Sequence, residues 1–278
     1  IVNLTFGLLS IGDRCFYNAN IKKLKIPAKV KRIDGCFIHI NDLREIEISQ
    51  NNHLFILHNN QFLLGKSNAD LDKFDILHFA LFDVKEALIP SEISVIAKYS
   101  FYSHKKLKSV IFDTNSELKK IESSSFAFTQ IANLTLPSNL EEIKTDSFKN
   151  TSSLKSVKFP VNSKLKTIFK SFENSKIESI FIPASVEHID NECFAFTHNL
   201  NKIEISPENK FFKLIDGSFV VKENEKGSGV FDSIFIARRN IESITIPSQI
   251  KVINCYAFHK CKKLKNVLFE NNSSLELI

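Results

Sequence analysis

The sequence contains no methionine and no tryptophan, and only 7 of its 278 residues are glycine. No apolar run approaches the roughly 20 residues that a membrane-spanning helix requires, so no span is predicted in this segment. The sequence also lacks GxGxxG, the P-loop, GxSxG, HExxH, CxxC and any Cys/His cluster at zinc spacing. We therefore expect no enzyme, no cofactor and no metal site.

Cysteine and net charge are also scarce. The five cysteines are an odd number, so at least one thiol has no partner within the chain. The net charge of +6 permits attraction to acidic surfaces without requiring it. With 43% hydrophobic and 24% charged residues, the composition is that of a folded protein.

What the sequence has in abundance is a repeat, in which the phrase apolar-x-x-apolar-x-apolar-Pro recurs. Most unit spacings are 20 to 24 residues and two are 41, which gives ten complete units and part of an eleventh. A regular spacing of this size is typical of solenoids. The units begin at Ile1, Ile21, Leu43, Val84, Leu107, Ile131, Leu154, Ile177, Leu200, Ile241 and Leu264.

Each unit predicts the same local structure. Apolar residues one apart, such as Leu134 and Leu136, lie on one face of a strand. Six of the seven prolines fall six residues after a unit start, where the missing amide hydrogen ends a laddered strand. A phenylalanine beside a small residue closes each unit that has no insertion, so we expect these rings to stack in one column. Polar groups such as 190–192 predict a short helical or 3₁₀ start before it.

The two 41-residue units align with each other without a gap at an offset of 157 residues. Within each, Asn59-Asn60 or Asp216-Gly217 separates two apolar runs, which predicts a two-residue hairpin turn. We therefore expect a single continuous array over 1–278, with protruding hairpin insertions at about 50–83 and 207–240. Because the sequence begins without methionine and stops inside a unit, we expect a piece of a longer protein.

Phrases such as IESIFIPASVEHIDNECF and IESITIPSQIKVINCYAF resemble the BspA-like, Treponema-type leucine-rich repeats over essentially the whole chain. The resemblance implies a right-handed leucine-rich-repeat solenoid of the β-rich α/β class. It implies a parallel sheet on one face, with short strands and helical or 3₁₀ turns on the others. It also implies a secreted or cell-surface protein that serves in adhesion or in protein recognition.

Two candidate partner sites follow from this arrangement. On the outward face of the sheet most positions are polar, but four are apolar, and two of these belong to adjacent units. The four residues are Leu88, Ile111, Phe181 and Leu268. The rival site is the pair of hairpins, since loops that leave a regular scaffold often carry function. Its candidate contacts are Phe55, Phe62, Phe211 and Phe212.

Three functions remain open at this point. The first is recognition of a protein or a host or cell-surface macromolecule, and the second is an intracellular scaffold on the same fold. The third is a polyanion- or glycan-binding surface, because the position after the unit start is often basic; nucleic acid is not favoured. These basic residues are Lys22, Arg44, Lys85, Lys108, Lys155 and Lys265, and Glu178 and Glu242 interrupt them. The sequence predicts neither the oligomeric state nor whether Cys15 and Cys36, in neighbouring units, form a disulfide.

Overall fold

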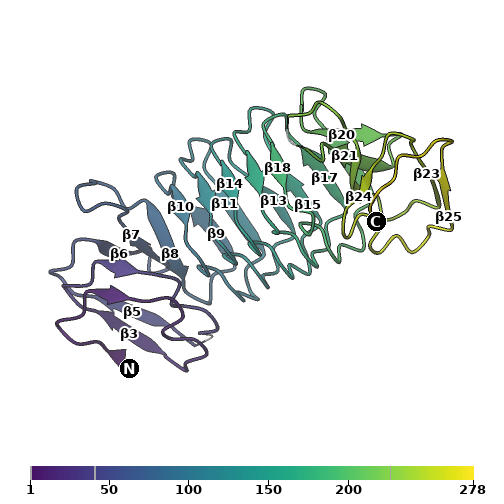
Figure 1. The fold of residues 1–278 in the computed structure, drawn as a ribbon. Helices are drawn as coiled ribbons and strands as arrows, with labels where there is room; N and C mark the ends of the chain where they lie inside the picture. Colours follow the sequence, from purple (N-terminus) through teal and green to yellow (C-terminus); the bar gives the residue numbers. More distant parts are fainter. Residues whose placement is uncertain (1, 41, 226) are drawn as a thin grey trace.

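The computed structural model describes residues 2–40, 42–225 and 227–278 as an elongated stack of short coils (Figure 1). Twenty-five strands and no helix occur among these residues. No described segment is a helix long and apolar enough to cross a bilayer. The predicted β-rich solenoid is therefore confirmed.

The first ladder of parallel strands forms the predicted sheet face. It pairs in register from coil to coil, for example Leu134 with Val157 and Ile180 with Ile203. Burial alternates along most of these strands, as in Glu86–Ile89, whereas Asn266–Phe269 at the C-terminal end is exposed at all four positions. The alternation confirms the inward columns of the sequence. The strands are β1 (Val2–Asn3), β3 (Lys23–Ile26), β5 (Glu45–Ile48), β9 (Glu86–Ile89), β11 (Ser109–Phe112), β13 (Asn133–Thr135), β15 (Ser156–Lys158), β17 (Ser179–Ile182), β19 (Lys202–Ile205), β23 (Ser243–Ile246) and β25 (Asn266–Phe269).

The second ladder consists of two-residue strands formed by the second apolar pair of each unit. One isoleucine of each strand is buried, and in the central coils it pairs with the isoleucine of the next coil, such as Ile121 with Ile143. The strands are β2 (Ser10–Ile11), β4 (Arg32–Ile33), β10 (Val95–Ile96), β12 (Lys120–Ile121), β14 (Glu142–Ile143), β16 (Thr167–Ile168), β18 (His188–Ile189) and β24 (Val252–Ile253).

The closing phenylalanines form the predicted spine. The rings of Phe126, Phe148, Phe172 and Phe194 are parallel within 6°, with successive centroids 5.3 to 5.7 Å apart. Each ring is fully buried, and its small neighbour fits beside it; Ser171, for example, donates its hydroxyl to the Phe169 carbonyl. Identical layers thus fill identical space.

The predicted helical starts before the spine are absent, and hydrogen-bonded turns replace them. Left-handed residues recur four apart within these turns, as at Asp146 (φ 59°) and Asn150 (φ 56°). A right-handed helix cannot continue through a left-handed residue, so each turn closes on its own. The chain therefore bends twice around the spine phenylalanine in coils such as this one, whereas the coil of Phe172 has one left-handed residue, Asn174.

Each insertion is a three-stranded antiparallel unit. The first comprises β6 (Phe55–His58), β7 (Phe62–Gly65) and β8 (Ile76–Ala80), and the second β20 (Phe212–Ile215), β21 (Phe219–Lys222) and β22 (Ser233–Ala237). The turn residues Asn59 and Asn60 have φ of 50° and 53°, which confirms the two-residue hairpin. The last strands rejoin the second ladder, where Leu77 pairs with Ile96 and Ile234 with Ile253.

Both insertions begin at a buried asparagine in the same phase. Asn52 donates its amide to the carbonyls of Pro27 and Val30 in the preceding coil, at 2.8 and 3.0 Å. Asn209 does the same to Pro183 and Val186, at 2.7 and 3.0 Å. These bonds satisfy buried carbonyls and fix the point where the chain leaves the coil.

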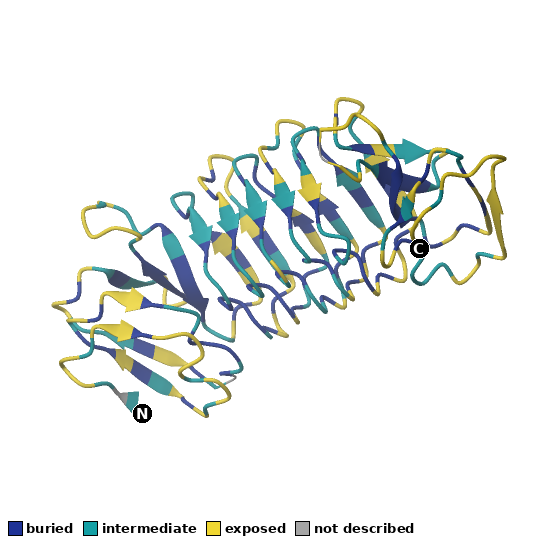
Figure 2. Ribbon diagram, in the orientation of Figure 1, coloured by how far each residue is buried: buried dark blue, intermediate teal, exposed yellow. Residues whose placement is uncertain are grey.

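The insertions are internal partitions and do not protrude as hairpins, which corrects the expectation above. In β7, Leu63 packs into the core of the N-terminal coils, whereas its neighbours Phe62 and Leu64 pack into the core of the central coils. In β21, Val220 faces the central core, and Phe219 and Val221 face the C-terminal core. Figure 2 shows buried strands at both places. A strand covered on both faces buries every side chain, so each partition separates two cores while holding them together.

Candidate functional site

The outward face of the sheet brings two of the four predicted contacts together. Leu88 and Ile111 are direct cross-strand partners in β9 and β11, and they are 61% and 44% exposed. Side chains at such positions lie about 5 Å apart and touch. The two residues therefore form one exposed apolar spot, which we call the apolar pair.

The other two predicted contacts lie elsewhere on the same face. Phe181 is half-buried on β17 opposite Glu204, and two strands, β13 and β15, separate it from β11. Leu268 is exposed on β25 opposite Thr245, at the C-terminal end of the stack. Neither residue contacts the apolar pair.

Small polar residues and one carboxylate surround the apolar pair, because Glu86 lies on the same face of β9 and opposite Ser109. Small polar residues follow one another in the neighbouring outward column, and the Ser156 hydroxyl donates to Asn133 Oδ1 at 2.9 Å. That column runs through Ser109, Asn133, Ser156 and Ser179. A depression of about 540 Å³ opens beside Ile111, lined by Phe112, Thr135 and Pro137 among others. Ion pairs return nearer the ends of the face, where Lys23 meets Glu45 and Lys202 meets Glu204.

The predicted hairpin contacts do not form a surface. Phe55, Phe62 and Phe212 are at most 3% exposed because they fill the cores on either side of the partitions, and Phe211 is half-buried against the central core. Buried rings cannot meet a partner without unfolding the partition. A signal was present in the sequence, since uninterrupted apolar runs such as 62–64 indicate a strand covered on both faces.

The predicted basic stripe is partly neutralised. Asp83 accepts Arg44 at 2.8 Å and Lys106 at 2.7 Å, and these two cations, Lys106 foremost, lower the pKa of its carboxyl group. Lys155 faces Glu178 of the next coil at 3.6 Å. Surface pairs of this kind contribute little stability, but they cancel the positive field that a polyanion would need.

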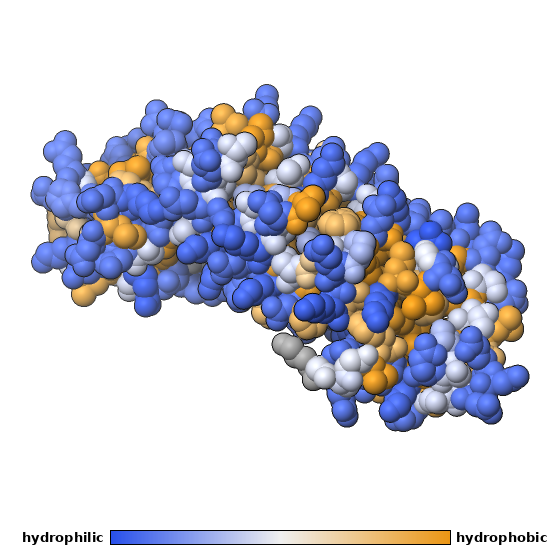
Figure 3. Space-filling view, turned by 90° about the horizontal axis from the view of Figure 1, so that it is seen from above, coloured by the Kyte–Doolittle hydropathy of each residue, from blue (hydrophilic) through white to orange (hydrophobic). Residues whose placement is uncertain are grey.

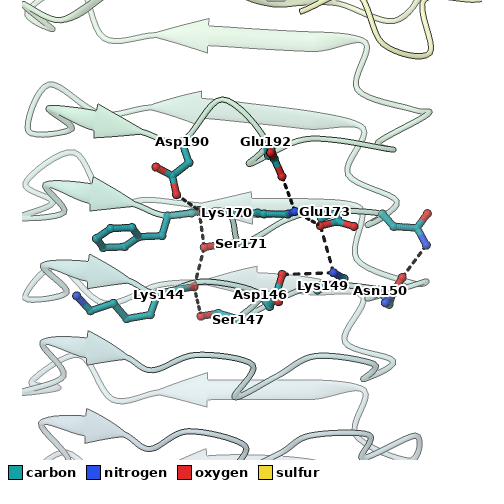
Figure 4. A network of polar contacts seen from close by, with 12 residues as sticks. Lys144, Asp146, Ser147, Lys149, Asn150, Lys170, Ser171, Glu173, Asp190 and Glu192 are labelled. Carbon is teal, nitrogen blue, oxygen red and sulfur yellow. Dashed lines mark hydrogen bonds and ion pairs between the residues drawn. The ribbon is translucent and has the colours of Figure 1, made fainter. Parts of the chain in front are cut away.

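A network of ion pairs crosses the turns beside the spine (Figure 4). Glu173 accepts Lys149 at 3.2 Å and Lys170 at 3.0 Å, and Lys170 also meets Glu192. Burial raises the pKa of Glu173, but the two ammonium groups outweigh it and the net pKa is lowered. The network braces three coils. No described group of three His, Cys, Asp or Glu side chains is arranged to hold a metal ion.

The cysteines are unpaired. Cys15 is exposed and Cys36 is buried in the next coil, and a hydrogen bond between the thiols lowers the pKa of Cys15. Burial raises the pKa of Cys193 to about 12, which makes that thiol inert.

The repeat matches the family described as "BspA type Leucine rich repeat region" over residues 1–76, 74–201 and 228–277. The chain belongs to the BspA-type leucine-rich-repeat family. The stretch 202–227, which the match omits, contains the first two strands of the second partition. No curated protein matches the sequence.

Solved structures share the BspA-type fold. The pneumococcal vaccine antigen PcpA is 22% identical with a TM-score of 0.63, and the match covers 96% of this chain and 58% of that one. A leucine-rich-repeat protein of Eubacterium ventriosum is 19% identical with a TM-score of 0.62, over 97% of this chain and 62% of that one. A leucine-rich cell-surface protein of Faecalibacterium prausnitzii is 16% identical with a TM-score of 0.52, over 91% and 70%. The chain thus spans 58% of the length of the pneumococcal antigen.

Proposed function

We propose that this chain is a non-catalytic recognition array at the cell surface, which binds a protein or another macromolecule through its sheet face. The observation that carries the proposal is the apolar pair, Leu88 and Ile111, exposed side by side on a mostly polar face. Contiguous exposed apolar side chains mark interaction sites more often than scattered ones.

The architecture supports a binding role. In each coil the inward residues pack against the neighbouring coils. The outward residues are therefore free to vary and to contact a partner. The uncharged column from Ser109 to Ser179 beside the apolar pair suits an interface, because charged residues are depleted at interface centres. The depression beside Ile111 offers a place for a side chain of the partner.

The cell-surface setting rests on similar proteins. One matched structure is named a vaccine antigen and another a cell-surface protein, and both share this fold. An intracellular scaffold could use the same face, and it would differ in location while keeping the binding surface. Surface labelling of the native protein in intact cells separates these two possibilities.

In the proposed arrangement, residues 1–278 form one continuous array, and the insertions at about 50–83 and 207–240 belong to the stack. Limited proteolysis tests this arrangement. We expect cleavage to begin in exposed loops such as 227–230 and to leave the partition strands intact.

The test of the binding face is the double variant Leu88→Asp/Ile111→Asp. Both side chains are exposed, so we expect the fold to persist and its circular dichroism spectrum to remain unchanged. Fluorescently labelled chain would be applied to cultured cells and to immobilised matrix proteins. We expect a loss of at least about tenfold in binding, because two carboxylates in an apolar contact cost more than about 1.4 kcal/mol.

The matched control is Ser243→Asp/Thr245→Asp, which adds the same charge to β23 on the same face. This control should bind like the unmodified chain. Equal binding by the control, the double variant and the unmodified chain would remove the apolar pair from the account.

A further inference from the structure

A second surface lies on the far side of the spine, at the corner where each coil turns back towards the sheet. The fourth residue after each spine phenylalanine forms one column there, and in three successive coils it is Lys176, His198 and Lys262. The second residue after the phenylalanine forms a parallel column, which contains Asn174 and Lys260. We call Lys176, His198, Lys260 and Lys262 the cationic corner.

These coils are true neighbours although an insertion separates them in sequence. The rings of Phe196 and His259 lie 4.5 Å apart, and the Phe196 amide donates to His259 Nδ1 at 3.2 Å. Arg239 of the second partition lies between the two coils, where it donates to the carbonyls of Phe194 and Thr197 on one side and of Ala257 on the other. The Lys260 ammonium lies 5.5 Å from the centroid of the Phe196 ring, so the two coils share one corner.

A cavity of about 540 Å³ opens at this corner. It is lined by amides, hydroxyls, one lysine, one histidine and one phenylalanine, with no carboxylate: Phe128, Asn150, Ser152, Asn174, Ser175, Lys176, His198 and Asn199. Asn174 donates to Asn150 Oδ1 at 2.6 Å, which aligns the two amides along the stack. Such a lining offers donors to an elongated polar ligand.

The electrostatics favour an anion. Burial, and then the positive charges of Lys260, Lys262 and Arg239, lower the pKa of His198. Among the described residues, no ion pair involves Lys176, Lys260 or Lys262. Arg239 is buried and contacts only carbonyl oxygens and the sulfur of Cys261, so its charge has no carboxylate partner there. The field of these groups is therefore uncompensated.

The first insertion supplies an internal comparison. Lys105 and Lys106 stand where Lys262 and Lys263 stand 157 residues later. At the first insertion, Asp83 forms ion pairs with both Lys106 and Arg44. At the second insertion, Asn240 and Asn201 replace Asp83 and Arg44, so the neutralising carboxylate is missing. The positive field is thus concentrated at one corner of the array.

We propose that the cationic corner binds a sulfated polysaccharide chain lying along the stack. The ammonium groups and His198 hold the sulfates, the amides of Asn150, Asn174 and Asn199 bond the sugar hydroxyls, and the partly exposed Phe128 ring packs on a sugar face. A linear anionic glycan matches columns that repeat at a fixed spacing. The rings of Phe128 and His198 also offer stacking surfaces for bases, so single-stranded nucleic acid is the alternative ligand that the experiment tests. This site is independent of the apolar pair.

The experiment measures binding of a size-defined heparin dodecasaccharide by calorimetry at about 0.15 M salt. We expect Lys176→Gln/Lys262→Gln to weaken binding at least about tenfold. The control Lys105→Gln/Lys106→Gln removes the same charge from the first corner, and we expect less than about a twofold change. Thermal melting followed by circular dichroism checks that both variants are folded.

Each other outcome overturns the proposal. If the unmodified chain fails to bind heparin at this salt concentration, or if both variants lose affinity equally, the cationic corner is not a specific binding site. If a uridine homopolymer or de-sulfated heparin binds as tightly, the ligand class is wrong. Leu88→Asp/Ile111→Asp should leave heparin binding unchanged, so failure of this proposal and failure of the sheet-face proposal remain distinguishable.

Discussion

The two insertions share the same strand arrangement. Different polar residues lie at the joint, which is the place where the end of each insertion contacts the next coil. At the first joint, His104 Nε2 donates to the Ala80 carbonyl at 2.7 Å, and its ring stacks on Phe82 with centroids 4.2 Å apart. At the second, Arg239 and Cys261 occupy the places of Phe82 and His104. Arg239 Nη1 donates to the Ala237 carbonyl at 3.2 Å, and Ala237 corresponds to Ala80.

The difference shows that the same buried carbonyl can receive its hydrogen bond in two ways. The last alanine of each partition presents a buried carbonyl that needs a donor, since an unpaired buried polar group costs about 1–3 kcal/mol. At the first joint, the neutral ring of His104 in the next coil donates to this carbonyl. The second meets it with a buried cation, which also bonds the carbonyls of Phe194, Thr197 and Ala257. The second joint is therefore both more strongly bonded and more positive.

The largest effect should come from breaking a partition itself. Leu63→Asp places an unpaired carboxylate in the N-terminal core, where Leu63 has no exposed surface, so we expect a loss of more than about 4 kcal/mol. Val220→Asp should do the same at the second partition. Urea unfolding measures both. Gln61→Asp, on the exposed turn beside Leu63, is the control, and a Leu63→Asp protein as stable as this control would contradict the partition.

Exchanging the chemistry of the joints should have the next largest effect. Arg239→Phe leaves several carbonyls without donors and should cost about 3 kcal/mol in the free energy of unfolding. The double variant Arg239→Phe/Cys261→His recreates the pair found at the first joint, so it should recover part of that loss. If the second change brings no recovery, the two joints are not equivalent solutions.

Acid should weaken the first joint more than the second. Burial lowers the pKa of His104 to about 4 from its usual 6.5. The unfolded chain therefore binds the proton more tightly, and stability is lost as the pH falls from about 6.5 towards 4. The full loss is about 3 kcal/mol below that range. His104→Thr, which places here the residue found at positions 129, 151 and 197, should flatten this part of the stability curve.

His78 is a control for that experiment because its pKa is also about 4 and it lies in the first partition. Acid sensitivity should therefore persist in part in His104→Thr. An unchanged pH dependence of the unfolding free energy between pH 4 and 6.5 would show that His104 is not buried as a neutral ring.

The smallest change in stability should follow Asp83→Asn, which gives the first corner the residue of the second. Asp83 is exposed, so the unfolding midpoint should hardly move. Heparin affinity should rise a few-fold, since Arg44 and Lys106 lose the carboxylate that neutralises them. A variant that binds heparin no better than the unmodified chain would remove charge compensation as the difference between the corners.

The repeat determined most of the fold in advance. The inward columns, the phenylalanine spine, the strand ends at proline and the turns at Asn59-Asn60 and Asp216-Gly217 all follow from periodicity, because each layer faces the same packing problem. The sequence also indicated Leu88 and Ile111 as neighbours. These features depend on the local residue pattern and on the register between coils. Both can be read directly from a repeated sequence.

The features that the sequence did not predict depend on contacts between distant segments. Left-handed backbone at Phe128 and Tyr99, which excludes a helix, has no residue signal because neither is glycine or asparagine. The Arg239 bonds reach carbonyls of another coil, which no local pattern encodes. The cationic corner exists only because the fold brings together two coils that the insertion separates in sequence. Figure 3 shows how uneven the resulting surface is, with apolar residues gathered in patches on a mostly hydrophilic face and the broadest patch towards the C-terminal end.

Hydrogen exchange of the partition strands tests the central claim most directly. Each of β7 and β21 lies between two antiparallel strands and has a core on either face, so the amides of 62–65 and 219–222 should exchange as slowly as those of β14 and β16. Exchange as fast as that of the exposed residues 227–230 would contradict an array whose insertions are built into the stack.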